Sequence, residues 1–405
     1  MRDWNSILAD EASDTVAKAR LDSWKAIAEY LKRSPRTVQR WHASFGLPVH
    51  HFGGSKGPVY SYSDELDAWL SGFSQETGEG VSGVDHQMSA RRKRSSELAA
   101  EADELWEIRT EDNLTAIASL YRSAVDLNPA NGPAFIGMAN AITLSALVGV
   151  MRGSAAYPRA ADAIQRAIRA GHDGPATQCA SAWLQMLYEK NWRKAREGFE
   201  GTLLSHPQSN HGLMGMALLH VAEGNLAAAM QRLGDAWKQN TLVTPTAALL
   251  GWVYYLQGSY KLALETVTQA RLSGDLSALA IIVEALIFLQ SEPVTAAVQI
   301  IEGLAGSHPD NAVLHGILGL ALVRSDRSGR ASEILHRLDR MQGDASFAAA
   351  LILLGLDERQ QAMSRLETCY AEGSLWSLSL RSDPALEQLR EGGLFGPRLK
   401  RLSPG

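Results

Sequence analysis

Cysteine and long apolar runs are both scarce in this chain. Only two cysteines, Cys179 and Cys369, occur among 405 residues, which is too few for a disulfide framework. The most apolar run, LSALAIIVEALIFL, is interrupted by Glu284 and is shorter than a membrane span. The first residues, MRDWNSILADEASD, are too acidic for a signal peptide. We therefore expect a cytoplasmic protein without membrane contact, in which both cysteines serve packing.

The sequence also lacks the motifs of common enzymes. It holds no phosphate-binding glycine loop, no metal-ligand spacing and no nucleophile elbow around serine or cysteine. We therefore expect no catalytic residues, no metal and no cofactor, and we expect that the chain is not an enzyme. With 45% hydrophobic and 20% charged residues, its composition is that of a folded protein, and 405 residues exceed one ordinary core. Two or more folded units are expected.

Positive charge is concentrated in one segment. The whole chain carries a net charge of −5, but seven basic and two acidic residues between Arg20 and Gly57 give that segment a charge of +5 (seven minus two). A basic segment inside an acidic protein is typical of a nucleic-acid contact surface.

Two short helices are expected within this basic segment, at residues 22–31 and 34–45. Apolar residues recur at helical spacing in LDSWKAIAEYL and again in SPRTVQRWHASFG. Ser34 suits the N-cap of the second helix and Pro35 its first position. When Trp41 points inward, polar side chains remain on the outer face near the start of that helix. This is the helix-turn-helix pattern, in which hydrogen-bond donors enter the major groove.

A β-hairpin and a third helix are expected next. LPVHHF and PVYSYS are predicted to form strands. The glycines of GGSKG between them permit a hairpin turn with Lys56 at its tip. A helix starts at Ser63 with DELDAWL, whose acidic first turn complements the helix dipole. The adjacent His50 and His51 point to opposite faces of a strand and lie near no cysteine or acidic cluster, which argues against a metal site.

The run LDSWKAIAEYLKRSPRTVQRWHASFGLPVH, followed by SKGPVYSYSDELDAWL, resembles the excisionase-like branch of the MerR-type winged helix-turn-helix families. In those families the second helix reads DNA and the wing touches its backbone, so the resemblance implies a double-stranded DNA partner. The candidate DNA-binding residues are Arg33, Ser34, Arg36, Thr37, Gln39, Arg40 and His42 at the second helix, with Ser55 and Lys56 in the wing. The alternative is that this small domain docks on a protein and its arginines form a solvated face.

Residues 73–97 separate the first domain, residues 20–72, from the rest. FSQETGEGVSGVDHQMSARRKRSSE lacks apolar periodicity and is rich in Gly, Ser and Gln, which predicts a flexible linker. The ARRKR residues within this segment have two interpretations: a run of solvated charges, or a basic arm that tracks along DNA.

The remaining chain repeats every 34 residues. Five alanines recur at that interval, each followed four residues later by a large apolar residue: Ala195, Ala229, Ala263, Ala297 and Ala331. The positions twelve residues before them are Trp183, Ala217, Gly251, Ala285 and Gly319, all small but the first. This period and pattern are similar to tetratricopeptide repeats. We expect about eight repeats in residues 98–370, forming an α-solenoid, and C-terminal capping helices in residues 371–405.

The first helices of these repeats carry an apolar stripe. Its members lie eleven and eight residues before the repeated alanines and are Leu184, Leu187, Leu218, Val221, Trp252, Tyr255, Leu286, Leu289, Leu320 and Val323. The stripe lacks the Lys/Asn pattern with which related arrays clamp a peptide carboxylate, so we expect a groove for an amphipathic helix, a partner subunit or an apolar small molecule. The alternative is that a tight superhelix buries the stripe within the chain itself.

Together these features predict a mostly α protein, in which a winged helix-turn-helix domain with a small β-hairpin precedes an α-solenoid. The chain is similar to bacterial signalling proteins that join a DNA-binding or kinase domain to tetratricopeptide repeats. This resemblance implies a DNA-binding transcriptional regulator whose solenoid oligomerises or senses a partner or ligand. Two alternatives are a repeat scaffold that uses the small domain for protein docking and an excisionase-like architectural DNA-binding protein.

Overall fold

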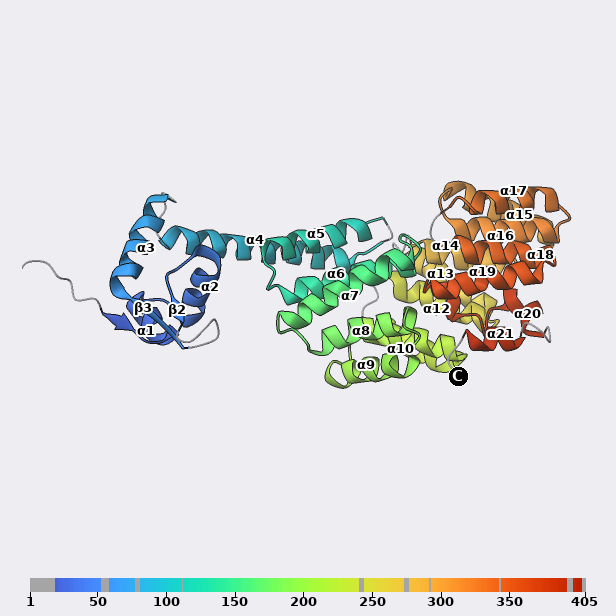
Figure 1. Cartoon of the computed structure of the whole chain (residues 1–405). Coiled ribbons are helices and arrows are strands. Elements are labelled where there is room, and N and C mark those ends of the chain that lie inside the picture. Colours follow the sequence, from blue (N-terminus) through green and yellow to red (C-terminus); the bar gives the residue numbers. More distant parts are fainter. Residues whose placement is uncertain are drawn as a thin grey trace, which may run out of the picture. The chain divides into compact units, whose positions relative to one another are not determined.

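The computed structural model describes residues 19–51, 58–76, 81–110, 112–239, 244–272, 277–290, 293–341, 344–391 and 396–402. The chain divides into two compact units, Met1–Arg91 and Arg92–Gly405. Figure 1 labels their helices and strands. Among the described residues, no helix is both long enough and apolar enough to cross a membrane.

The first unit combines three helices with a small antiparallel sheet. In chain order its elements are β1 (Arg20–Leu21), α1 (Trp24–Tyr30), α2 (Pro35–Phe45), β2 (His50–His51), β3 (Val59–Tyr62) and α3 (Ser63–Glu76). The sheet order is β1-β3-β2, so the expected hairpin of β2 and β3 is present and β1 adds a third strand that the sequence pattern did not predict.

Two capping serines set the starts of α1 and α2. The Ser23 hydroxyl accepts a hydrogen bond from the Ala26 N–H at 3.1 Å, and the Ser34 hydroxyl accepts one from the Thr37 N–H at 3.2 Å. Gly46 ends α2 in the left-handed conformation, with φ at 65°. The core beneath these helices is formed by Ile27, Ala28, Val38, Trp41, Leu47, Val49, Val59 and Leu66. The expected helix pair therefore has a hydrophobic core of its own.

Most of residues 73–97, expected to be a flexible linker, is helical instead, and the boundary between the two compact units, at Arg91–Arg92, falls within this range. Helix α3 continues to Glu76, and a single helix, α4, runs from Val81 to Glu107. From Gln87 onward the segment consists almost entirely of good helix formers with no Gly or Pro. The helix is then held by tertiary contacts, because Leu98 and Ala102 are buried against α5 and α6. The polar composition of this segment therefore led to a linker prediction where the structure has an amphipathic helix.

The second unit is an α-solenoid of tetratricopeptide type. Within the described residues its helices form eight successive pairs: α4 with α5 (Leu114–Leu127), α6 (Gly132–Leu147) with α7 (Gly153–Arg169), α8 (Pro175–Leu187) with α9 (Trp192–Ser205), α10 (Asn210–Glu223) with α11 (Leu226–Gln239), α12 (Thr244–Leu256) with α13 (Tyr260–Leu272), α14 (Ala278–Phe288) with α15 (Val294–Ser307), α16 (Ala312–Arg324) with α17 (Ser328–Leu338), and α18 (Ala345–Gly355) with α19 (Arg359–Ala371). Figure 1 shows them in sequence order, from blue for α4 through green and yellow to red.

The 34-residue pattern gives the correct packing register. Each of the five repeated alanines is at most 3% exposed, and each lies in the second helix of a pair. At Gly251, on α12, an added Cβ would lie 2.5 Å from the Val267 side chain on α13, so only a residue without a side chain allows the two helices to approach this closely. Both cysteines are buried, as expected for packing residues.

The chain ends in short helical pieces that close the solenoid. They are η2 (Leu375–Leu378), η3 (Pro384–Leu386), α20 (Glu387–Glu391) and α21 (Gly396–Arg401). The Arg381 guanidinium donates a hydrogen bond to the Glu223 carbonyl oxygen at 3.2 Å, and the Ser154 N–H donates to the Glu372 carboxylate at 3.0 Å. The end of the array is thus tied to its second and fourth helix pairs.

Candidate functional site

The outer face of α2 presents the expected polar side chains. Arg33, Arg36 and Gln39 are exposed, and Arg40 is half-buried. Helix α2 contains no acidic residue, so the positive charge at its start is not neutralised from within the helix. The positive charge of this face is suited to the phosphate backbone of DNA. Its long side chains carry hydrogen-bond donors that suit the acceptors on base edges.

Three other members of the predicted DNA-binding set are engaged within the domain. The hydroxyls of Ser34 and Thr37 hydrogen-bond to each other at 2.8 Å at the start of α2. The His42 imidazole lies 2.8 Å from the Leu47 carbonyl oxygen, and its ring packs beside Trp24 at 5.7 Å. His42 therefore fixes the end of α2, and in this arrangement it is poorly placed to read a base. The wing residues Ser55 and Lys56 lie outside the described residues.

The His50 side chain belongs to an internal polar contact. Its Nε2 lies 2.7 Å from a Glu65 carboxylate oxygen, and its ring stacks on Tyr60 at 5.2 Å. No group of three or more His, Cys, Asp or Glu side chains in the described part of the chain is placed to hold a metal ion. His50 thus helps to join the sheet to α3.

The predicted open groove in the solenoid is wrong. All nine stripe residues from Leu184 to Leu320 are at most 4% exposed, and Val323 is half-buried. Trp252 and Tyr255, expected to anchor a partner, have no exposed surface. The alternative stated from the sequence, burial of the stripe within the chain, describes this structure. The reason is that sequence periodicity identifies an apolar face but not what covers it.

The C-terminal residues 374–391, hereafter the C-terminal segment, cover the middle of the stripe. The Trp376 ring meets the Trp252 ring edge-on at 5.7 Å and stacks on the Phe347 ring at 5.2 Å. The Trp376 indole N–H donates to the Asp344 carboxylate at 3.1 Å, and the Tyr255 hydroxyl donates to the Asp383 carboxylate at 3.3 Å. Aromatic packing is therefore combined with directed hydrogen bonds.

Two carboxyl groups lie at this contact, and burial raises the pKa of each. The pKa of Asp383 is raised to about 6, although the Ala385 N–H and the Arg390 side chain oppose the shift. The pKa of Asp344 is also raised to about 6, against the hydrogen bonds from Ser374 and Trp376. Desolvation disfavours the charged carboxylate in both places. Burial at this contact therefore favours the protonated form of both carboxyl groups.

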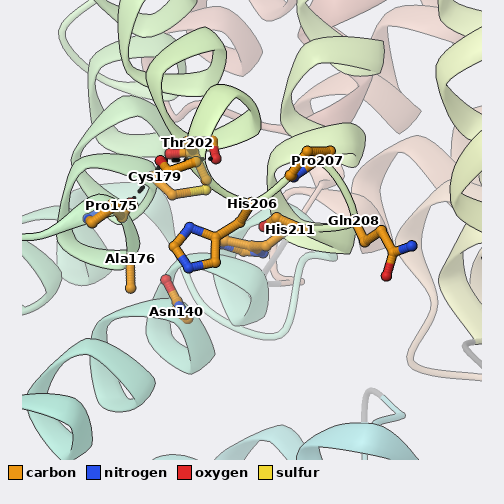
Figure 2. Close-up of a pocket in the computed structure, with 11 residues that line it drawn as sticks. Asn140, Pro175, Ala176, Cys179, Thr202, His206, Pro207, Gln208 and His211 are labelled. Atoms are coloured by element: carbon orange, nitrogen blue, oxygen red, sulfur yellow. Dashed lines mark hydrogen bonds between the residues drawn. The ribbon is translucent and has the colours of Figure 1, made fainter.

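A cavity of about 680 Å³ opens on the first half of the solenoid (Figure 2). Its lining residues come from α6, α8, α9, α10 and the turn before α10, and are Asn140, Pro175, Ala176, Cys179, Thr202, Ser205, His206, Pro207, Gln208, Ser209 and His211. None is Asp, Glu, Lys or Arg. Burial raises the pKa of the Cys179 thiol to about 12, and burial together with the Arg109 charge lowers the pKa of His211 to about 3. The lining of this cavity therefore carries hydrogen-bonding groups but no Asp, Glu, Lys or Arg side chain.

A second cavity, of about 660 Å³, lies where early and late repeats meet beside the C-terminal segment. Leu147 and Val148 line it from the end of α6, and Leu279, Asp344 and Trp376 line it from the opposite part of the chain. Neither cavity was predicted. Their lining residues are spread over several repeats, and no short motif marks them.

Comparisons with known proteins give similar solved structures at low sequence identity and no matching family. No protein-family model matches the sequence, and no curated protein matches it significantly. A chain in the crystal structure of the APC/C hetero-tetramer Cut9-Hcn1 is similar over 75% of this chain and 55% of that one, with 15% identity and a TM-score of 0.48. A tetratricopeptide-repeat protein from Parabacteroides merdae is similar over 71% and 98%, with 12% identity and a TM-score of 0.39.

Yeast Tom70 is similar over 83% of this chain and 63% of its own, with 10% identity and a TM-score of 0.40. The chain thus spans 55% of the Cut9-Hcn1 chain and 63% of Tom70. These identities and TM-scores are low. The repeat assignment therefore rests on the 34-residue period and the helix pairing of the chain itself.

Proposed function

We propose that the chain is a DNA-binding transcriptional regulator, in which the first unit contacts duplex DNA and the solenoid supplies self-association or ligand sensing. The observation that carries the proposal is the outer face of α2. Arg36 and Gln39 are exposed there, while Val38 and Trp41 anchor the helix from beneath. A helix held rigidly in this way presents its donors in a fixed geometry, as major-groove reading requires.

The hairpin and the charge balance support the same proposal. Strands β2 and β3 follow α2 directly, and the loop between them contains Lys56. Between Arg20 and Gly57 the sequence carries the +5 charge described above, whereas the whole chain carries −5. Duplex DNA releases condensed counterions when such a surface binds, which favours association at low salt.

Gel-shift titrations with the full chain across a salt series test the DNA contact. If their side chains read bases, Arg36→Ala and Arg40→Ala are each expected to weaken specific binding by about 1–3 kcal/mol. Lys56→Ala is expected to weaken binding to all sequences and to reduce the salt slope by about one. Lys261→Ala, which removes an exposed charge from α13, is the matched control and is expected to leave binding unchanged. Equal binding by the parent and all four variants would refute the proposal.

A scaffold function is the second candidate, and the repeat architecture favours it. Helical repeats present extended surfaces for other proteins. In that case the arginines of α2 are a solvated face. The gel-shift series separates the two, because a scaffold shows neither sequence-specific binding nor a response to Arg36→Ala.

A further inference from the structure

A small cavity lies in the interior of the solenoid, next to the larger cavity of Figure 2. Its lining residues come from α4, α6, α8, α10 and the turn after α4, and are Trp106, Arg109, Thr143, Leu144, Leu147, Trp183, His211 and Met214. Its volume of about 10 Å³ is close to the room that one water molecule needs. His211 also lines the larger cavity, so the two adjoin at this residue. The small cavity therefore has room for one water molecule or one monatomic ion.

Two buried polar groups in the wall of this cavity lack hydrogen-bond partners. Trp183 is only 2% exposed, and among the described residues neither its indole N–H nor Nε2 of His211 has a partner. The two rings lie beside each other, with their centroids 5.0 Å apart. A buried donor without an acceptor destabilises a fold, so native proteins fill such places with a water molecule or an ion. The wall of this cavity thus calls for a guest that accepts hydrogen bonds.

A buried positive charge lies at the same cavity. Arg109 is 7% exposed, its guanidinium carbon lies 4.5 Å from the centre of the Trp106 ring, and it donates to the Trp106 carbonyl oxygen at 2.6 Å. Burial lowers the pKa of this guanidinium to about 10, although Glu107 and Tyr121 oppose the shift, so it stays charged at neutral pH. Burial and the Arg109 charge together lower the pKa of His211 to about 3, so the imidazole is neutral. None of the described residues that line the cavity is acidic.

We propose that this cavity binds a single small anion of about the size of chloride, held by the Trp183 indole N–H, the Arg109 guanidinium and the His211 ring. Indole and guanidinium nitrogens only donate, and a neutral imidazole can carry its one N–H on either ring nitrogen. A halide ion accepts hydrogen bonds from each of these groups. It also brings the negative charge that a guanidinium favours in a place of low dielectric constant. A water molecule brings no charge, so the wall favours the anion.

The position of the cavity gives the anion a measurable effect. Its walls belong to the first four helix pairs, because α4, α6, α8 and α10 each contribute to them. A guest that binds there contacts all four pairs in the folded chain and has no such site in the unfolded chain. The anion is therefore expected to stabilise this half of the solenoid.

Thermal melts of the full chain at constant ionic strength test the proposal. Sodium chloride replaces sodium gluconate stepwise, because the gluconate ion is too large for the cavity. We expect the melting temperature to rise by at least about 2 °C between about 1 and 100 mM chloride. Constant ionic strength keeps the screening of surface charges equal in all samples.

Two variants locate the effect of chloride. Trp183→Phe removes the unpartnered N–H and keeps an aromatic ring, and we expect it to lose most of the rise in melting temperature, whatever its stability in gluconate. Trp237→Phe on α11 is the matched control, since it makes the same substitution at a half-buried position outside the cavity lining. It is expected to keep the full rise.

Crystals of the full chain grown in sodium bromide provide the second measurement, because bromide scatters anomalously. We expect an anomalous peak between Trp183, Arg109 and His211. This measurement needs only the parent chain, so it also decides the question if Trp183→Phe does not fold.

Three results would overturn the proposal: equal melting temperatures of the parent chain in chloride and gluconate, a full chloride effect in Trp183→Phe, or no bromide at the cavity. The cavity would then hold a water molecule at most. The measurements use no DNA, so their failure leaves the proposed DNA binding unaffected.

Discussion

Asp383 shows at the scale of one residue how burial opposes ionisation. Its side chain has no exposed surface, and it accepts hydrogen bonds from the Ala385 N–H at 3.0 Å and from the Tyr255 hydroxyl at 3.3 Å. These bonds favour the carboxylate, yet desolvation is the larger effect, since the pKa is raised to about 6. The charged form therefore weakens the folded state at neutral pH.

The substitution Asp383→Asn is expected to raise the melting temperature at pH 7.5. With a folded-state pKa of about 6, above the ordinary 3.8, this carboxyl group contributes stability that is complete below pH 4 and is lost as the pH rises through 6. A shift of this size corresponds to about 3 kcal/mol. Asparagine keeps an acceptor oxygen and removes the charge. Melts between pH 4 and 7.5 should show a flatter profile for this variant than for Asp310→Asn, which changes an exposed residue.

The double substitution Trp252→Ala, Tyr255→Ala is expected to destabilise the fold rather than to remove an exposed contact. Both side chains are fully buried, and truncating a buried large aromatic residue costs about 3–5 kcal/mol. Chemical denaturation should therefore show a large loss of stability. A stability equal to that of the parent chain would mean that the C-terminal segment does not pack on α12.

At the scale of helices, small residues set the distance between the two members of a repeat. Ala263 on α13 has no exposed surface, and the neighbouring Gly251 on α12 faces Val267 at close range. Protein interiors are densely packed, so added volume at such a contact displaces whole helices.

Ala263→Leu is expected to lower the free energy of unfolding by about 1–3 kcal/mol, because it overfills this contact. Ala296→Leu on α15 adds the same atoms at an exposed helical position and is the control, with little expected effect. Urea denaturation of both variants provides the measurement. Equal midpoints for the two would mean that the 34-residue register has been assigned incorrectly.

At the scale of the whole molecule, the proposed DNA contact and the proposed self-association of the solenoid act together. One recognition helix offers few base contacts, and specific operators are commonly read as two half-sites by a dimer. We expect the full chain to bind a two-half-site DNA more tightly than a single half-site at equal salt. Gel-shift titration measures both affinities. Identical affinity for the two DNAs would separate self-association from DNA binding.

Local rules account for what the sequence by itself determined. Ser34 and Pro35 predicted where α2 begins, because caps act within one turn of a helix. The five alanines predicted the helical repeats and their register, because each repeat packs mainly against its sequence neighbours.

The tertiary structure decided the features that depend on distant residues. It made a helix of residues 81–107, a segment whose composition is that of a linker, and buried its later part, at Leu98 and Ala102, in the core that includes α5 and α6. It also filled the expected groove, because Trp376 and Asp383 reach α12 from more than a hundred residues further along the chain. Sequence periodicity marks the apolar face of a helix, but only the folded chain determines which side chains cover that face.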